Sequence, residues 1–471
     1  MASSSLMLPT AQSLPQVDPR AVDVDDLLSK ELSRLSFQHR SAIYEEIHGV
    51  RTLCPEETPE LVEECLHQLS VELACMGPNL KTAYDEACLM YPETSYIHTN
   101  EFKLRFLRYE LMNPKKAALR IVSFLECAVE LFGKALLQRP LQLSDLGKDG
   151  MDCLRCGDYQ PLPFRDRAGR RIIAFVNTFC LQYPIEVRMK VIYYLHWALT
   201  EDTESQRKGL VGVLWWPTLG CSQTELSYAP GPRDHILGAR LYAGNPARVA
   251  AIHICLPNKP LFALLRSVFL LAIGDARQRI KVHAGEGLAV QYSLHGYGIP
   301  VDLIPVTEAG NVKTKNHQQW IKVRRMKERN CTDSPDEAVE CPCLNDVIFR
   351  IGDSYLHHPG NVMFRGLIEA RYEAYTSAGR NEKIAITWSL VDEVLNRNGR
   401  FLVWDAQWWS VLHDREKMRE KVAGAFKNQK RKLKSLSNTQ TFESSTYEFE
   451  RQDGHKRKRT DVERATCLCK C

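Results

Sequence analysis

Cysteine and histidine are the residue types in this sequence that could bind a metal ion, and their spacing gives two candidate sets. Cys153 and Cys156 form one C-x-x-C pair, but no second pair lies at a standard zinc spacing from it. The second set is Cys331, Cys341, Cys343 and His357. Its members lie in or beside a segment that we expect to be a flexible linker, and isolated cysteines in a reducing compartment are usually inert. We therefore predict no metal site.

The sequence contains none of the common catalytic or phosphate-binding motifs. A Walker loop, a dinucleotide-binding G-x-G-x-x-G, a G-x-S-x-G nucleophile elbow and an H-E-x-x-H zinc motif are all missing. The histidines in the central region have no Asp or Cys partner at local spacing; they are His253, His283, His295 and His317. We predict that the protein is not an enzyme and needs no cofactor.

Length and charge set the broad class of the protein. The 471 residues are enough for two or three domains, and 62 basic against 57 acidic residues give a net charge of +5. That charge is too small to indicate nucleic-acid binding by itself. The chain begins without a basic segment followed by an apolar run, and no stretch has the roughly 20 apolar residues of a membrane span. We predict a cytoplasmic protein with free thiols.

The element that organises the chain is the segment 248–281. Nearly every residue of Val249–Leu256 is apolar, which predicts a strand buried on both faces of a parallel sheet. Pro257 ends the strand, and Asn258 can cap a helix that follows. One stripe of that helix is apolar, and a basic turn comes after it. Two interpretations stay open: a plain hydrophobic core, which the pattern alone favours, or the wall of a pocket for an apolar ligand with an anionic head group.

This arrangement resembles the CRAL-TRIO, or Sec14-like, lipid-exchange domain. In that family a Pro-x-Arg, here Pro246 to Arg248, precedes a strand and then a mobile gate helix beginning Leu-Phe, here Leu261 and Phe262. The Phe-Leu-Arg and Lys-Ala elements of segment 103–117 resemble the helical lobe that precedes the domain. The Asp-Arg-Ala-Gly-Arg turn at 166–170 resembles the start of the family's sheet. This chain departs from the family at Arg171, where Pro is usual, and at Trp215 and Trp216, where an Asp is usual.

The resemblance implies a helical lobe at 32–145 and an α/β lipid-binding domain with a mainly parallel sheet at 150–329. The lipid would be a phospholipid or another apolar ligand, bound and exchanged with membranes. The implied pocket has a floor, a lid and a head-group site. The floor is Val211, Val213, Ile252 and Ile254; the lid is Phe262, Leu265, Phe269 and Ala272; the head-group site is Arg277, Arg279 and Lys281.

Beyond a linker at 330–344, residues 345–427 resemble a small uncharacterised domain abundant in diatom proteins. Its marks are Asn-Asp-Val at 345–347, His-Pro-Gly-Asn at 358–361, Gly-Arg-Phe-Leu at 399–402 and a late Trp. The family's Gly-Arg-Gly loop is replaced by Phe349-Arg350-Ile351-Gly352. We expect a mostly α-helical fold with no strand in its first half. The expected order is a helix from Val362 capped by Asn361, a helix at about 383–397, a hairpin around 405–407 and a helix at 415–427.

A second function stays open, because helix, helix, hairpin and helix is also the order of a winged-helix-like reader of nucleic acids. On that hypothesis the protein is a nucleic-acid or protein adaptor that acts through residues 345–427 and a basic tail, and nuclear localisation is not excluded. Arg365, Arg371 and Arg400 would contact the partner.

Both termini, 1–31 and 428–471, have compositions typical of disordered segments. The tail carries basic runs at 430–434 and 456–459 and ends in Cys469-Lys470-Cys471. That ending resembles the Cys-x-Cys of doubly geranylgeranylated small GTPases and is not a CaaX box. Lipidation of Cys469 and Cys471 would make the protein a peripheral membrane protein. An unmodified tail with reduced thiols is the interpretation we favour.

Overall fold

The computed structural model describes Ser33 and residues 36–176, 182–216, 243–258, 278–307, 310–329, 338–350, 353–405 and 408–433. The chain divides into two compact units. The first unit comprises 1–343 with 406–409, and the second comprises 344–405 with 410–471. We describe each unit by itself.

The first unit begins with the predicted series of helices. They are α2 (Phe37–Ile47), α3 (Pro59–Cys75), α4 (Thr82–Met90), α5 (Asn100–Tyr109), α6 (Pro114–Phe132) and α7 (Gly147–Cys156), with short 3-10 turns between them. Local sequence explains where the helices begin: the Thr58, Thr99 and Asn113 side chains each accept a hydrogen bond from a backbone N–H in the first turn that follows. Leu69, Phe106 and Phe124 then pack into one core.

The Phe-Leu-Arg segment of α5 connects this helical series to the helices α8 (Ile185–Leu199) and α9 (Thr203–Lys208). Phe106 and Leu107 are fully buried. Arg105 donates to the Trp197 carbonyl oxygen at 3.0 Å, and its guanidinium lies 3.7 Å from the centre of the Trp197 ring. Arg108 donates to Glu57 at 2.8 Å and to Gln206 at 2.6 Å. The motif is therefore a structural connection within the first unit.

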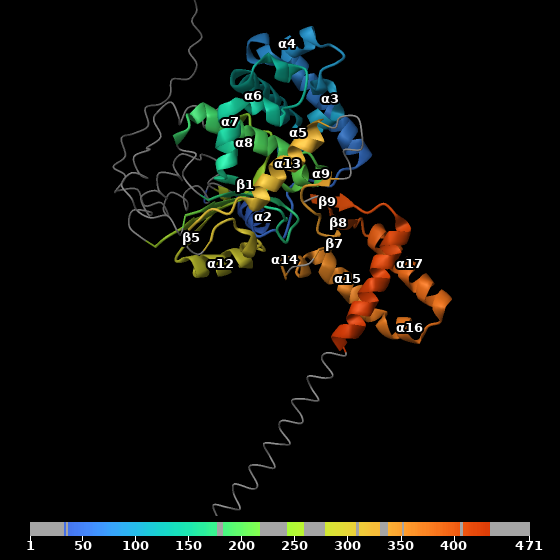
Figure 1. The fold of residues 1–471 in the computed structure, drawn as a ribbon. Helices are drawn as coiled ribbons and strands as arrows, with labels where there is room; N and C mark the ends of the chain where they lie inside the picture. The colour runs from blue at the N-terminus through green and yellow to red at the C-terminus, as the bar shows by residue number, and fades with distance from the viewer. Residues whose placement is uncertain are drawn as a thin grey trace, which may run out of the picture. The chain divides into compact units, whose positions relative to one another are not determined.

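A five-stranded sheet forms the centre of the first unit (Figure 1). Its strands, in spatial order, are β1 (Tyr159–Pro161), β2 (Arg171–Phe175), β3 (Leu210–Trp215), β4 (Val249–Leu256) and β5 (Ile280–Ala284). β1 pairs antiparallel with β2, and all other neighbours are parallel. The prediction of a mainly parallel sheet is confirmed, and so are the bounds of β4. After β5 and a following helix the chain forms a 3-10 turn, η7 (Val301–Leu303).

Two more helices complete the described part of the first unit: α12 (Gly287–Gly296) beside β5, and α13 (Lys315–Arg329) beside β1. α13 carries many basic residues, and Trp320 and Val323 of this helix are buried in the unit. Arg324, only 2% exposed, donates to the carboxylates of Glu201, Glu328 and Glu340 at 2.7–2.9 Å.

Glu340 lies within the segment predicted to be a flexible linker, beside the short strand β6 (Ala338–Val339). It also accepts a hydrogen bond from the Trp320 indole at 2.9 Å and lies 3.6 Å from the Arg171 guanidinium. Ala338, Val339 and Cys341 are buried. Because these contacts fix it in the first unit, the second half of the predicted linker is part of a folded core.

The second unit contains β7 (Val347–Phe349), α14 (Asp353–Leu356), α15 (Pro359–Ala370), α16 (Tyr372–Ser377), α17 (Arg380–Asn396), β8 (Phe401–Asp405), β9 (Trp408–Val411, part of which belongs to the first unit) and a last helix over 415–433. The hairpin and the last two helices agree with the prediction. The strand-free first half is wrong, because β7 pairs in parallel with β8.

The His-Pro-Gly-Asn motif does not provide the helix cap that we predicted. α15 begins at Pro359, so Asn361 lies inside the helix and does not cap it. Its side chain accepts from the Ile348 backbone N–H at 2.7 Å and donates to the carbonyls of Ile348 and Tyr355. A Cβ on Gly360 would lie 2.0 Å from the Asp346 carbonyl oxygen. The Gly-Asn pair therefore holds α15 against β7.

Candidate functional site

The parallel sheet of the first unit has two faces, which we name after neighbouring residues of β4. The Ile252 face carries Ile173, Phe175, Gly212, Leu214, Ile252, Ile254 and Val282. The His253 face carries Ile172, Ala174, Val211, Val213, Ala251, His253, Cys255, Lys281 and His283. The assignment follows from the register, because successive side chains of a strand point to opposite faces.

The His253 face is covered by described helices. Ile47 of α2 and Val290 and Leu294 of α12 form one core with Val211 and Val213. Glu46 of α2 is 1% exposed and binds the guanidinium groups of Arg248, at 2.6 Å, and Arg279. Burial opposes ionisation, but the two guanidinium groups outweigh it and lower the pKa of the Glu46 carboxyl.

The Ile252 face is covered unevenly. On the β1 side it contacts the helical core: α8 and α13 lie beside β1, and Leu210 is buried in that core. Toward the carboxyl ends of the strands, Ile254 is buried but its neighbours are only half-buried. These half-buried residues are Ile173, Phe175, Gly212, Leu214, Ile252 and Val282. An apolar surface thus lies at the carboxyl ends of parallel strands, where α/β proteins commonly bind ligands.

The four predicted floor residues do not share one surface. Ile252 and Ile254 lie on the Ile252 face, whereas Val211 and Val213 lie on the His253 face. The physical reason is a register shift between Leu210 and Val211, which pairs Val211 with Ala251. Because side chains alternate along a strand, a shift of one residue moves the rest of that strand to the other face relative to its neighbour.

The predicted lid residues Phe262, Leu265, Phe269 and Ala272, the predicted head-group residue Arg277 and the predicted lipidation sites Cys469 and Cys471 lie outside the described residues. The two other head-group residues are described. Arg279 binds Glu46, and it donates to the Ala250 carbonyl at 3.2 Å. Lys281 lies on the His253 face, and its Nζ is 5.0 Å from the centre of the Tyr44 ring. The structure therefore brings neither cation to the Ile252 face.

A pair of histidines lies on the His253 face, and sequence spacing gave no sign of it. Nδ1 of His253 in β4 lies 3.0 Å from Nε2 of His283 in β5, and Nδ1 of His283 lies 2.7 Å from Oγ of Ser293 in α12. The Tyr297 ring contacts both imidazoles and stacks on His48. Burial lowers the pKa of His283 to about 4 and that of His253 well below its usual value. Both rings are therefore neutral near pH 7.

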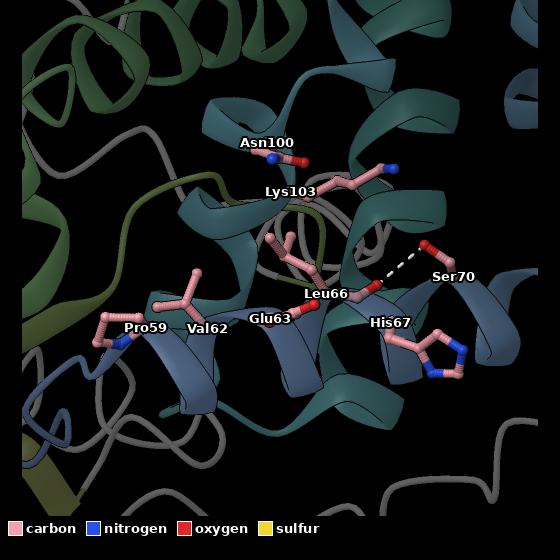
Figure 2. Close-up of a pocket in the computed structure, with 8 residues that line it drawn as sticks. All are labelled: Pro59, Val62, Glu63, Leu66, His67, Ser70, Asn100 and Lys103. Carbon is pink, nitrogen blue, oxygen red and sulfur yellow. Dashed lines mark hydrogen bonds between the residues drawn. The ribbon is translucent and has the colours of Figure 1, made fainter.

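An open groove of about 520 Å³ lies between α3 and α5 (Figure 2). Val62 and Leu66 supply its half-buried apolar surface. The polar side chains that line it are Glu63, His67, Ser70, Asn100 and Lys103, and all of them are exposed or half-buried. Ser70 donates back to the Leu66 carbonyl at 2.9 Å. With no desolvated polar group, this groove has none of the features of a catalytic centre.

The arginines assigned to partner binding in the second unit are engaged within it. Arg371 donates to Glu393 at 2.5 Å, and Arg400 binds Asp346 at 2.7 Å, whereas Arg365 is half-buried. Asp346 is fully buried, so its pair with Arg400 fixes the start of β7 to the start of β8.

In the described ranges, no group of three or more His, Cys, Asp or Glu side chains is arranged to hold a metal ion. The C-x-x-C pair ends α7, where the Cys156 thiol donates to the Cys153 carbonyl at 2.8 Å. No helix among the residues that the structure describes has the length and apolar character needed to cross a membrane.

Residues 346–428 match the model of a family described as a domain of unknown function, DUF6824. The matched segment contains the Gly-Asn pair of α15 and the Asp346–Arg400 ion pair described above. A search of the curated proteins found no match to this chain.

Proposed function

We propose that the first unit binds an apolar ligand, such as the acyl chains of a lipid, against the Ile252 face of its sheet. The observation that carries the proposal is Gly212, in the middle of β3 and surrounded by the half-buried side chains of that face. The resemblance of the sequence to the CRAL-TRIO family supports a phospholipid as the class of ligand.

The absence of a side chain at Gly212 leaves space above the sheet. The backbone conformation at this position does not require a glycine. A Cβ built there would meet only Ile252 Cγ1 at 3.9 Å and the Ala251 carbonyl oxygen at 4.0 Å, which is ordinary contact. A glycine in a strand costs roughly 0.5–1 kcal/mol relative to alanine. Glycine inside a strand often marks a place where a ligand or another chain approaches closely.

The apolar side chains around Gly212 supply the driving force for binding. Each buried CH₂ group of a ligand contributes about 0.8 kcal/mol, so an acyl chain leaves a bilayer only for a surface of similar apolar character. Leu214, Ile252 and Val282 offer such a surface on three neighbouring strands. Apart from Arg171 at the start of β2, whose guanidinium lies 3.6 Å from Glu340, no charged residue of β2–β5 lies on the Ile252 face.

The test is lipid extraction from the purified full chain, followed by mass spectrometry. Gly212→Leu adds a bulky side chain to the Ile252 face, and we expect it to lower the bound lipid by about tenfold through loss of the binding volume. Gly212→Ala is the matched control, since its Cβ fits, and it should retain most of the lipid. Circular dichroism checks that both variants fold. Equal lipid content in wild type and Gly212→Leu, with both folded, would contradict the proposal.

The adaptor hypothesis gains no comparable support from the second unit. Two of its three candidate arginines are bound to carboxylates, and β7 precedes the helices, so the element order differs from the helix, helix, hairpin and helix on which that hypothesis was based.

A further inference from the structure

The histidine pair on the His253 face connects strand β4 to helix α12 through β5. His253 is 0% exposed and His283 is 8% exposed, and their ring centres lie 5.3 Å apart in a stacked arrangement. Ser293 extends the connection to α12. Among the described strands β5 lies at the edge of the sheet, and β4 is its neighbour.

The geometry of the pair limits how many protons it can hold. At an N···N distance of 3.0 Å one ring donates and the other accepts. A third N–H proton can be added with this hydrogen bond intact, but it places a positive charge in a buried site. A fourth would set two N–H groups against each other and break the bond. Nε2 of His253 is also buried and has no hydrogen-bond partner to stabilise an N–H.

The surroundings of the pair offer no negative charge to balance a proton. α2 contributes His48, the turn before β2 contributes Arg170, and β5 contributes Lys281. Ser293 of α12 and Tyr297, the C-cap residue of α12, also contact the pair. On the same helix, Glu286 and His295 are exposed. The carboxylate of Glu46 is bound by Arg248 and Arg279. In the described part of the chain, the charged groups that act most strongly on His253 and His283 are basic.

We propose that His253 and His283 form a proton-sensitive switch: proton uptake loosens the β4–β5 edge of the sheet and releases the apolar ligand from the Ile252 face. The release rests on the proposed function. The coupling is through the strands themselves, because His253 lies between Ile252 and Ile254 in β4, and His283 follows Val282 in β5. The same backbone thus carries the proton site on one face and the ligand surface on the other.

The first arm of the test needs no ligand. Urea unfolding of the full chain is measured between about pH 7.5 and pH 5, the range in which an ordinary imidazole titrates. We expect the wild type to lose stability toward the acid end and His283→Gln to lose less, by about the contribution of one imidazole, because glutamine keeps a donor and an acceptor but does not titrate. The buried His196, His253 and His317, whose pKa values burial also lowers, contribute to the remaining pH dependence of both proteins. His295→Gln is the matched control: His295 is exposed on α12, and its substitution should leave the pH dependence unchanged. If His283→Gln does not fold, His253→Gln replaces it.

The second arm measures release. The protein is loaded with pyrene-labelled phosphatidylcholine from vesicles, and loss of the probe is followed after gel filtration. We expect loss from the wild type to be about tenfold faster near pH 5 than near pH 7.5, because a difference of one pKa unit between the closed and the loosened sheet shifts their equilibrium by about tenfold. In His283→Gln the two rates should differ by less than about twofold.

The outcomes separate the two proposals. Equal pH dependence of stability in wild type and His283→Gln would overturn the switch. If His283→Gln changes the pH dependence of stability but probe loss from the wild type does not depend on pH, the regulatory role is overturned and ligand binding is left intact. Failure of the wild type to retain the probe at neutral pH would overturn the proposed function and the release with it, and the proton site itself would still be judged by the first arm.

Discussion

The two faces of the parallel sheet are built from the same strands and from similarly apolar residues, yet they differ in what covers them. α2 and α12 close the His253 face with an apolar core and a buried ion-pair network. The Ile252 face keeps a half-buried apolar area around Gly212. Apolar character alone therefore does not separate core from binding surface. What separates them is whether neighbouring elements bring side chains of the right shape.

Of the substitutions on the His253 face, Glu46→Gln should have the largest effect on stability. It leaves the buried guanidinium groups of Arg248 and Arg279 without a carboxylate, and losing one partner of a buried ion pair costs about 3–5 kcal/mol. The free energy of unfolding in urea is the measurement. The neighbouring Glu45→Gln is the control: Glu45 is half-exposed and 3.9 Å from Arg51, so we expect a change below about 1 kcal/mol. Equal effects of the two variants would mean that the network does not hold α2.

Two neighbouring isoleucines of β2 compare the faces directly. Ile172 is 0% exposed on the His253 face, whereas Ile173 is half-buried on the Ile252 face. Ile172→Ala should lower the free energy of unfolding by about 2–5 kcal/mol because it leaves a cavity in a closed core. Ile173→Ala should cost less, about 1 kcal/mol, since less apolar area is lost from a packed environment. Equal losses would show that both faces are equally covered.

His283, on the His253 face, should make the stability of the protein depend on pH. The pKa of His283 is about 4 in the folded chain, and 6.5 is its ordinary value. The unfolded chain binds more protons between these values, so stability is fully present above about pH 6.5 and falls as the pH decreases toward 4. Chemical unfolding at a series of pH values measures this. In Ser293→Ala, His283 loses its hydrogen-bond partner in α12, and the midpoint of the pH dependence should move.

The smallest expected effect is that of Gly212→Ala. Its Cβ fits in ordinary contact, and alanine is favoured over glycine in a strand by about 0.5–1 kcal/mol, so stability should stay unchanged or increase slightly. Gly209 is the contrasting position: its φ is +75°, and a Cβ there would lie 2.9 Å from the Arg248 carbonyl oxygen. Thermal unfolding of Gly212→Ala and Gly209→Ala should therefore give opposite or clearly unequal shifts.

Local sequence was sufficient to predict much of the fold. The continuous apolar run of Val249–Leu256, ended by Pro257, predicted the bounds of β4. Such elements depend on periodicity and on residues that stop a helix or strand, and both are visible in a single sequence.

The site could be predicted only in part, because it depends on register and on long-range pairing. A single shift between Leu210 and Val211 decides which face Val211 and Val213 occupy, and no composition or periodicity shows it. His253 and His283 are separated by 30 residues and meet only when β4 pairs with β5. Asn361 was predicted as a helix cap because Asn often caps helices, but Pro359 starts the helix earlier and leaves the Asn361 amide free to bind β7.

The contacts of Glu340 have a consequence for where the polypeptide can be shortened. The last described helix before Glu340 is α13, which ends at Arg329, and this makes Arg329 an obvious end for a shorter product, whether made by a protease, by alternative splicing or in the laboratory. A product that ends there lacks the carboxylate bound by Arg324 and Trp320. Arg324 would keep Glu201 and Glu328 but lose one buried carboxylate, and losing one member of a buried ionic cluster is destabilising. A shortened version of the first unit that retains the residues through Cys343 should therefore be more stable than one that ends at Arg329.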